Sequence, residues 1–234
     1  MDYKELSKIS ETNNFWLEAK LGLIDTLLHK IDKRNIKILN IGTGTGEEIK
    51  VLKKYGKVYA IDINSDAIKM IPKGLCEEKK VCDATDITYP DEFFDLVTSF
   101  DVFEHIKNDS KSVREVKRIL KPSGYLIFTV PAFQFLFSSR DKALEHKRRY
   151  NKAELRLLLK KFHVVCMGYW NFFLFIPISI MRLLAARSRP KLDHVELGRN
   201  INFVLYNILE IENRLIRNNI SLPIGLTIYG ICKK

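Results

Sequence analysis

The chain has 234 residues, 46% of them hydrophobic, which is enough to bury the core of one domain covering residues 1–234. Its net charge of +11 favours anionic partners such as nucleic acid, anionic lipid or a phosphorylated small molecule, although a solvated lysine-rich surface has the same composition. The four cysteines contain no C-x-x-C pair and no apolar run opens the sequence, so we expect a cytoplasmic protein without a disulfide framework, a cysteine metal site or a secretory signal.

Helix-like and strand-like segments alternate along most of the sequence. Residues 2–33 are predicted to be helical, because their apolar residues recur at helical spacing. The predicted strands are 36–41, 57–63, 79–83, 93–100, 124–130 and 163–170. The predicted helices between them are 46–54, 65–71, 109–120 and one that begins after Asn151. This order predicts an open α/β sheet of parallel strands, with a ligand site at the carboxyl ends of the strands.

The alternation fails after residue 170. Residues 171–219 are predicted to be an all-helical insertion, with helices at about 172–187 and 195–218, followed by a last strand at 225–232. We expect this insertion to form a cap over the carboxyl ends of the strands, because it is longer than a simple connection requires. Part of it is uncharged, but Pro177 and Arg182 interrupt it, which argues against a membrane span. An apolar helix followed by basic residues can instead lie peripherally on an anionic membrane, or pack on the domain.

A glycine-rich turn, ILNIGTGTGEEI at 38–49, joins the first strand to the next helix. It lacks the Gly-Lys-Ser/Thr end of a P-loop, and its G-x-G-x-G spacing differs from the dinucleotide-binding G-x-G-x-x-G. Glu47 and Glu48 already complement the positive end of the helix dipole and would repel a pyrophosphate. The turn therefore favours a ligand without phosphate that carries positive charge, such as S-adenosylmethionine, over a tight turn that binds no ligand.

Two carboxylates follow the next strands. Asp62 ends the second strand, where it can accept hydrogen bonds from both ribose hydroxyls, and Ser65 and Asp66 are expected to cap the following helix instead. Asp83 follows the third strand and can accept from an adenine amino group, although it could simply begin a loop. We expect the glycine turn and these two side chains to face one crevice.

These segments resemble the class I S-adenosylmethionine-dependent methyltransferases. The resemblance covers 36–132 and is carried by ILNIGTGTGEEI, VYAIDIN, VCDA, FDLVTSFDVFEHI and RILKPSGYLIFTVPA. It implies a Rossmann-like seven-stranded sheet with helices on both faces and an antiparallel last strand. Asn40 and Thr43 depart from the residues usual in the family. The cofactor-binding residues that it implies are Gly42, Thr43, Gly44, Gly46, Asp62, Ile63, Asp83, Ala84 and Phe100.

Methyl transfer is an in-line displacement at an activated carbon, so the protein mainly has to position the reactants, and we expect no metal. The candidate catalytic residues are His105, which could meet Asp101 across a helical turn, and His146. The basic loop around His146 offers Arg148, Arg149 and Tyr150 to an anionic acceptor, or is merely a solvated charged loop.

The predicted function is S-adenosylmethionine-dependent methyl transfer to a small-molecule or lipid- or glycan-linked acceptor. The segments at 138–150 and 222–225 are similar to a subgroup often associated with glycan or lipid-linked sugar assembly. Two alternatives stay open: an RNA methyltransferase, supported by charge but lacking an appended RNA-binding module, and a cofactor-binding protein without transferase activity. The sequence does not name the acceptor, the acceptor atom or the oligomeric state.

Overall fold

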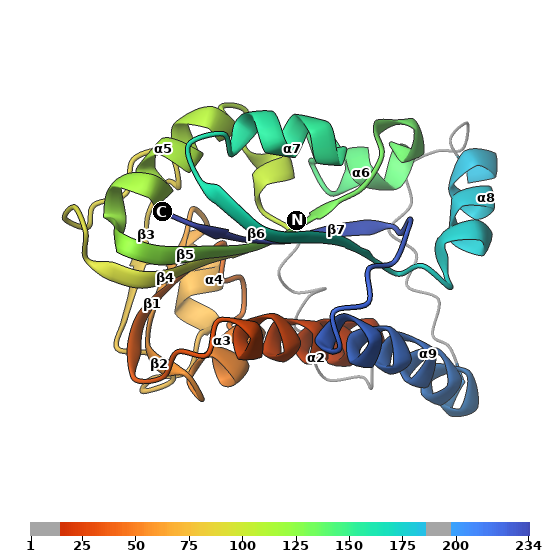
Figure 1. The fold of residues 1–234 in the computed structure, drawn as a ribbon, viewed down its shortest axis with the longest axis horizontal. Coiled ribbons are helices and arrows are strands. Elements are labelled where there is room, and N and C mark those ends of the chain that lie inside the picture. Colours follow the sequence, from red (N-terminus) through yellow and green to blue (C-terminus); the bar gives the residue numbers. More distant parts are fainter. Residues whose placement is uncertain (1–14, 186–197) are drawn as a thin grey trace.

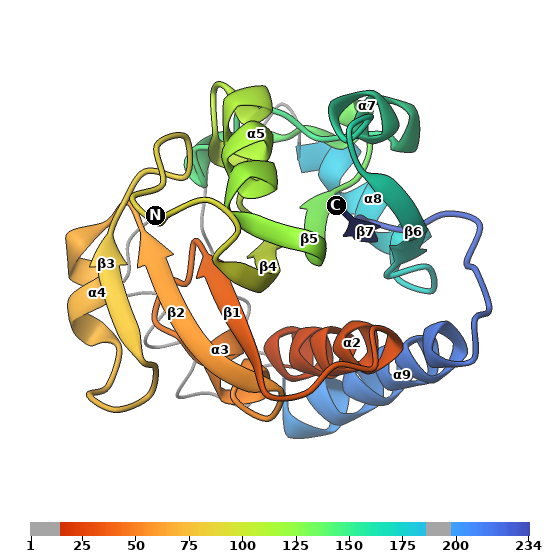
Figure 2. The same cartoon turned by 60° about the vertical axis from the view of Figure 1, so that its left-hand side comes forward.

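The computed structural model describes residues 15–185 and 198–234. Seven strands form one sheet in the order β3-β2-β1-β4-β5-β7-β6, which can be followed across Figure 2. The strands are β1 (Ile36–Ile41), β2 (Gly56–Asp62), β3 (Glu78–Val81), β4 (Phe94–Phe100), β5 (Leu120–Pro131), β6 (His163–Trp170) and β7 (Thr227–Lys233). The seven predicted strands are therefore all present, and β7 is antiparallel to both of its neighbours, as the family resemblance implied.

Helices cover both faces of the sheet (Figure 1). The helices are α2 (Phe15–Lys30), α3 (Glu47–Leu52), α4 (Ser65–Met70), α5 (Asp109–Ile119), α6 (Ser139–Ala143), α7 (Lys152–Leu158), α8 (Phe175–Ala185) and α9 (Arg199–Arg217). Two 3₁₀ turns, η1 (Phe103–His105) and η2 (Gln134–Leu136), follow β4 and β5. In Figure 1, α5, α6 and α7 lie above the sheet and α2, α3 and α9 below it. The part of the predicted helix 2–33 that precedes residue 15 lies outside the described residues.

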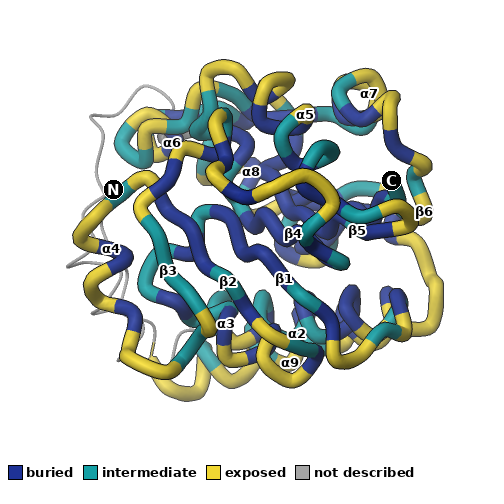
Figure 3. Tube along the Cα trace, turned by 90° about the vertical axis from the view of Figure 1, so that its left-hand side faces the viewer, coloured by how far each residue is buried: buried dark blue, intermediate teal, exposed yellow. Residues whose placement is uncertain are grey.

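The hydrophobic core lies on both faces of the sheet. Figure 3 shows β1 and β2 buried over most of their length, with exposed residues concentrated on the outer sides of the helices. On one face, the fully buried Leu23 and Leu27 of α2 pack in the same cluster as Leu209 of α9. On the other face, Val116 of α5 and Leu155 of α7 belong to a second buried cluster. Because both faces are covered, the parallel strands read as continuous apolar runs rather than as alternating ones.

The order in which strands are added to the sheet reverses after β3. From β1 the chain moves outward through β2 to β3, and it then returns to place β4 on the other side of β1. β1 is parallel to both β2 and β4, so the carboxyl ends of these three strands are neighbours. A switch in strand order of this kind leaves a crevice beyond the carboxyl ends, which is where open α/β sheets bind ligands.

The strand β5 begins earlier than predicted, at Leu120 rather than at Gly124. The register with β4 passes from Phe94 opposite Leu120 to Leu96 opposite Tyr125, so the segment 121–124 bulges from the ladder. Proline is tolerated in such a bulge because no ladder hydrogen bond is required there. Because the composition of this segment is typical of a turn, the sequence did not predict the first part of the strand.

The insertion contributes the two helices α8 and α9. The helix α9 packs along α2, where the side chain of Asn213 donates to the carbonyl of Ala19 at 3.0 Å. Glu212 of α9 is fully buried and accepts three backbone N–H groups at the start of the insertion, from Asn171, Phe172 and Phe173. α8 stands beyond the carboxyl ends of the strands (Figure 1), whereas α9 lies against a face of the domain. Among the described residues, no helix has the length and apolarity needed to cross a lipid bilayer.

Candidate functional site

The glycine turn leaves β1 with three residues in the left-handed backbone region. Gly42, Gly44 and Gly46 have φ angles of 67°, 51° and 91°. A Cβ atom added at Gly42 would lie 2.3 Å from Cγ2 of Val102, while one at Gly44 would meet no heavy atom within 4 Å. Glycine is therefore required at the first position by close packing, and at Gly44 the backbone borders open space that a ligand could fill.

Asp62 holds this turn from the end of β2. Its side chain is buried, and its two oxygens accept the N–H groups of Gly44 and Asn64, each at 2.9 Å. A carboxylate oxygen can accept a second hydrogen bond, so both oxygens retain capacity for a ligand hydroxyl. Asn64, rather than Ser65 and Asp66 as predicted, caps α4, because its side chain accepts the N–H groups of Asp66 and Ala67.

The other predicted cofactor residues fall into two groups. Ile63 and Asp83 are exposed, with 71% of Ile63 accessible, and they follow β2 and β3, which are neighbours in the sheet. One oxygen of Asp83 accepts the N–H of Thr85 at 2.7 Å. Ala84 and Phe100 are buried, and Phe100 packs in the core. An exposed apolar side chain next to a polar acceptor suits the face and the edge of an adenine ring.

The turn also presents a buried polar atom without a partner. The hydroxyl of Thr43 is buried and has no hydrogen-bond partner among the described residues. Together with the open space at Gly44 and the spare acceptor capacity of Asp62, this orphaned hydroxyl fits a polar ligand such as S-adenosylmethionine. The residues present therefore match the requirements of that cofactor.

The charge of Glu48 is balanced within the protein. Lys20 of α2 lies 3.2 Å from Glu48 and 3.0 Å from Asp101, which follows β4. Burial alone would lower the pKa of Lys20, but the two carboxylates raise it, so the ammonium group stays charged. Glu47 is paired with Lys50 at 2.6 Å. The two acids at the start of α3 are thus paired with lysines, and the contact with Lys20 was not predicted from the sequence.

Asp101 lies at a strained position next to the turn. Its φ angle of 56° is unusual for a residue other than glycine, and such outliers concentrate at functional sites. The backbone N–H and the side chain of Asp101 are both bonded to Thr129 at 3.0 Å. The predicted pairing of Asp101 with His105 is not made: Asp101 pairs with Lys20, and His105 contacts His146 instead.

The structure brings the two predicted catalytic histidines together. The ring centroids of His105, on η1, and His146, in the loop after α6, lie 4.6 Å apart with an edge-to-face angle of 87°. Burial, followed by the neighbouring His146, lowers the pKa of His105 to about 4, so this imidazole is neutral at pH 7. His146 Nδ1 lies 3.1 Å from Oδ1 of Asp141. The fold therefore holds both rings in place through their contact with each other and through Asp141.

Arg149 is not available to grip an acceptor as predicted. Only 4% of it is exposed, and its guanidinium contacts Asp141 at 2.7 and 2.9 Å and the carbonyl of Ala132 at 3.0 Å. Arg182 of α8 reaches the same carboxylate at 3.0 Å. Asp141 thus neutralises a buried arginine and joins α8 to the loop.

Arg148 and Tyr150 are also held by internal contacts. Arg148 donates to Asp109 at 3.0 Å and to the carbonyl of Lys107 at 2.8 Å, and Tyr150 is buried with its hydroxyl 2.9 Å from Asp109. Arg148 remains half-buried at the edge of an open cleft of about 730 Å³ between α5 and α7. All three residues line this cleft, but only the side chain of Arg148 is substantially exposed, so Arg148 is the one of the three that can still meet an anion.

Known proteins resemble this chain in sequence over the part that holds the glycine turn. Residues 39–128 match a protein family described as "Methyltransferase domain". The ubiquinone/menaquinone biosynthesis C-methyltransferase UbiE of Paraburkholderia phymatum is 33% identical over 100 residues, covering 39% of this chain and 41% of that protein. The corresponding protein of Cupriavidus taiwanensis is 30% identical over 118 residues, covering 47% of this chain and 48% of its own. The chain therefore matches less than half the length of these relatives.

Solved structures extend the likeness over the whole fold. A SAM-dependent methyltransferase from Archaeoglobus fulgidus superposes with a TM-score of 0.58 at 20% identity, covering 92% of this chain and 94% of that one. The YcgJ protein of Bacillus subtilis gives a TM-score of 0.61 at 18% identity, covering 91% and 96%. Residues 39–128 therefore match the methyltransferase family in sequence, and the chain shares its overall fold with these solved structures.

Proposed function

We propose that this protein transfers a methyl group from S-adenosylmethionine to a small-molecule acceptor by in-line displacement. The observation that carries the proposal is the hydrogen bond from the N–H of Gly44 to Asp62. It holds a carboxylate that can accept hydrogen bonds from a ligand beside an open glycine turn. When bound, the cofactor supplies a methyl carbon that its sulfonium group activates. The protein has to bind, orient and shield the reactants.

Each part of the site has a distinct task in this proposal. The glycine turn lets the backbone approach the cofactor, and Asp62 accepts hydrogen bonds from the ribose hydroxyls. Asp83 accepts from the adenine amino group, and Ile63 covers the ring. Glu48 and Asp101 provide negative charge that favours a cationic ligand, and Lys20 offsets one of these two charges.

We expect S-adenosylmethionine and its demethylated product to bind with micromolar affinity and NAD not to bind, because a glycine turn followed by acids disfavours a pyrophosphate. Titration calorimetry with all three ligands measures this directly. Binding of NAD without binding of S-adenosylmethionine would contradict the proposal. A labelled methyl donor incubated with fractionated cell extract then tests turnover, and a protein that binds the cofactor but labels no fraction would fit the alternative without transferase activity.

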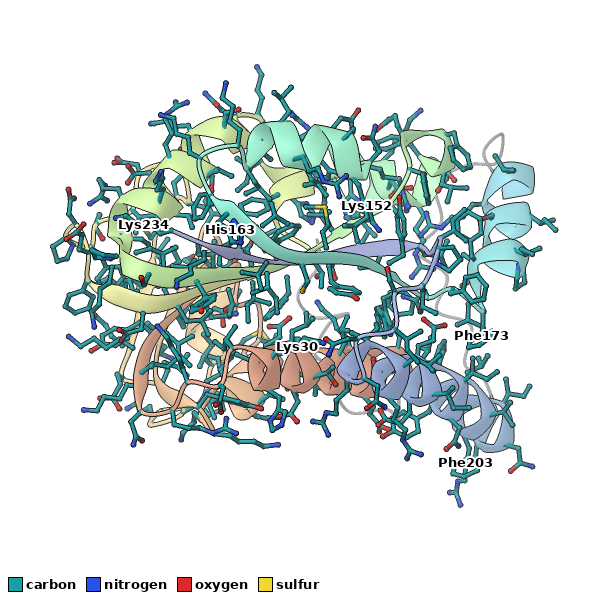
Figure 4. The ribbon with its side chains drawn as sticks, viewed as in Figure 1. Lys30, Lys152, His163, Phe173, Phe203 and Lys234 are labelled. Atoms are coloured by element: carbon teal, nitrogen blue, oxygen red, sulfur yellow. The ribbon has the colours of Figure 1, made fainter. Side chains whose placement is uncertain are left out.

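For the acceptor, we propose a lipid-linked or otherwise amphipathic molecule reached at an anionic membrane surface. Large apolar side chains are exposed on each of the two helices of the insertion, and we treat them together as the α8–α9 apolar surface: Ile176, Ile180, Met181 and Leu183 of α8 and Ile201, Phe203 and Val204 of α9. Figure 4 shows Phe203 at the outer end of α9, away from the sheet, and Phe173 near the start of α8. Exposed apolar patches of this kind mark interaction sites.

Two further observations favour a membrane over a protein partner. The net charge of the chain is +11, and the sequence between the two helices contains Arg187, Arg189 and Lys191, which suits an anionic bilayer. Matched relatives are C-methyltransferases whose names place them in ubiquinone and menaquinone biosynthesis. The α8–α9 apolar surface would then take an apolar acceptor directly from the bilayer.

We expect the protein to float with vesicles that contain anionic lipid, and this binding to weaken as salt screens the charges. Replacing Ile180 and Phe203 by serine should reduce the vesicle-bound fraction about tenfold or more, because each side chain loses roughly 1.5–3 kcal/mol of burial. Leu157→Ser is the matched control, since Leu157 is 69% exposed on α7, outside this surface. If the wild-type protein, the Ile180 and Phe203 serine variant and Leu157→Ser all float equally, or if none floats at low salt, the membrane proposal is wrong. The α8–α9 apolar surface would then be assigned to a protein partner.

A further inference from the structure

Glu104 is a buried carboxylate without a counterpart. It is fully buried on η1, and neither of its side-chain oxygens has a hydrogen-bond partner among the described residues. A carboxylate in this environment is costly unless it takes up a proton or a cation. The neighbouring side chains show whether the site favours a proton or a cation.

Two imidazole rings lie beside this carboxylate. One oxygen of Glu104 and one ring nitrogen each of His105 and His146 lie within 4.8 Å of one another. Tetrahedral ligands at bond lengths of about 2.1 Å are separated by about 3.4 Å, so side-chain shifts of about 1 Å would bring the three atoms onto one ion. Two histidines and a carboxylate form a donor set that binds zinc or iron and leaves further positions open.

The surrounding contacts orient His146 as metal ligands are oriented elsewhere. Its Nδ1 faces Oδ1 of Asp141 at 3.1 Å, which places the proton on Nδ1 and leaves the lone pair of Nε2 free. A carboxylate behind a histidine in this way fixes the ring and raises its basicity as a ligand. The backbone N–H of Lys147 donates to the carbonyl of Glu104 at 2.7 Å, so the loop is fastened to η1.

We propose that Glu104, His105 and His146 form a binding site for a single divalent transition-metal ion, with zinc the first candidate. The sequence predicted no metal, because methyl transfer requires none and the cysteines form no metal-site pattern. The structure, however, brings η1 and the loop after α6 into contact. A metal ion would give a partner both to the unpaired carboxylate of Glu104 and to the two imidazoles beside it. A proton on Glu104 would neutralise the carboxylate but would not involve the imidazoles. Metal binding here stands independently of the proposed methyl transfer.

The position of the cluster makes the proposal relevant to function. Val102 contacts the glycine turn closely, as the crowding of a Cβ at Gly42 shows, and Glu104 lies two residues further along the chain. The open positions of the ion would therefore lie at the carboxyl edge of the sheet, near the turn. If the proposed methyl transfer holds, an acceptor oxygen could occupy one of them, because a bound metal lowers the pKa of an oxygen ligand.

The test is metal binding by the full-length protein, measured without cofactor or acceptor. After chelator treatment, zinc is titrated in competition with a chromophoric chelator, and cobalt is added separately to read the coordination geometry from its visible spectrum. We expect one zinc ion per chain. Glu104→Gln and His146→Ala should each weaken binding about 100-fold, and His105→Ala serves as a second histidine variant if His146→Ala unfolds.

His163→Ala is the matched control, because His163 is exposed at the amino end of β6, whereas η1 follows the carboxyl end of the parallel strand β4. It should leave zinc affinity unchanged. The proposal is overturned if the wild-type protein binds no zinc, if Glu104→Gln and both histidine variants bind as tightly as it does, or if binding follows the cysteines instead. Calorimetry with S-adenosylhomocysteine on the same samples reports separately on the cofactor site, so failure of one proposal is distinguishable from failure of the other.

Discussion

Asp141→Asn is expected to lower the free energy of unfolding by about 3–5 kcal/mol, because it leaves a buried arginine without its counter-charge. Asp141 is 1% exposed and contacts Arg149 at 2.7 and 2.9 Å. The same carboxylate accepts the N–H and the hydroxyl of Ser138, which begins α6, and a hydrogen bond from Arg182 of α8. Burial alone would raise the pKa of Asp141, but the hydrogen bonds from His146 and Arg149 hold it far below its usual range.

Denaturant unfolding of the variant, followed by circular dichroism, measures this loss. Asp91→Asn provides the matched control, because Asp91 pairs with Arg118 at 2.7 Å but its side chain is 72% exposed. Exposed pairs of this kind contribute about 1 kcal/mol or less, so the control should change stability little. Similar small losses in both variants would mean that Arg149 finds another acceptor or reaches water when Asp141 loses its charge.

This ion pair also shows why the contacts of the basic loop could not be predicted from the sequence. The basic loop 140–150 contains several cations, and composition alone cannot distinguish a cation that faces solvent from one that closes onto a buried acid. In the structure Arg149 and Tyr150 are buried, and Arg148 contacts Asp109 of α5, a partner distant in sequence. Pairings of this kind depend on how helices pack over the sheet, which the spacing of charges does not specify.

The parallel sheet, in contrast, was predictable from local features. Its strands are buried on both faces, so they appear in the sequence as unbroken apolar runs separated by capped helices. The glycine turn and Asp62 were predictable for a related reason, since strand order alone brings the carboxyl ends of β1 and β2 together. The contact of Lys20 with Glu48 and Asp101 was not, because it depends on where α2 docks.

Asp62→Ala is expected to weaken the binding of S-adenosylhomocysteine roughly ten- to hundredfold. Hydrogen bonds to a charged group contribute about 1.5–3 kcal/mol, and the carboxylate is the proposed acceptor for the ribose hydroxyls. The structure adds a second cause, because the same two oxygens hold the N–H groups of Gly44 and Asn64. Asp62→Asn should also impair binding, since its amide nitrogen would face one of these donors and cannot accept from it.

Asp66→Ala tests whether the effect is specific to the carboxylate at the end of β2. Asp66 lies in the first turn of α4, and its 74% exposed side chain pairs with Lys69, so this variant should bind within about twofold of the wild-type protein. Calorimetry measures the affinities, and thermal melting verifies that each variant is folded. If Asp62→Ala is folded and binds as tightly as the wild-type protein, the ribose must lie elsewhere. Removing the acceptor of two bound ribose hydroxyls would necessarily weaken binding.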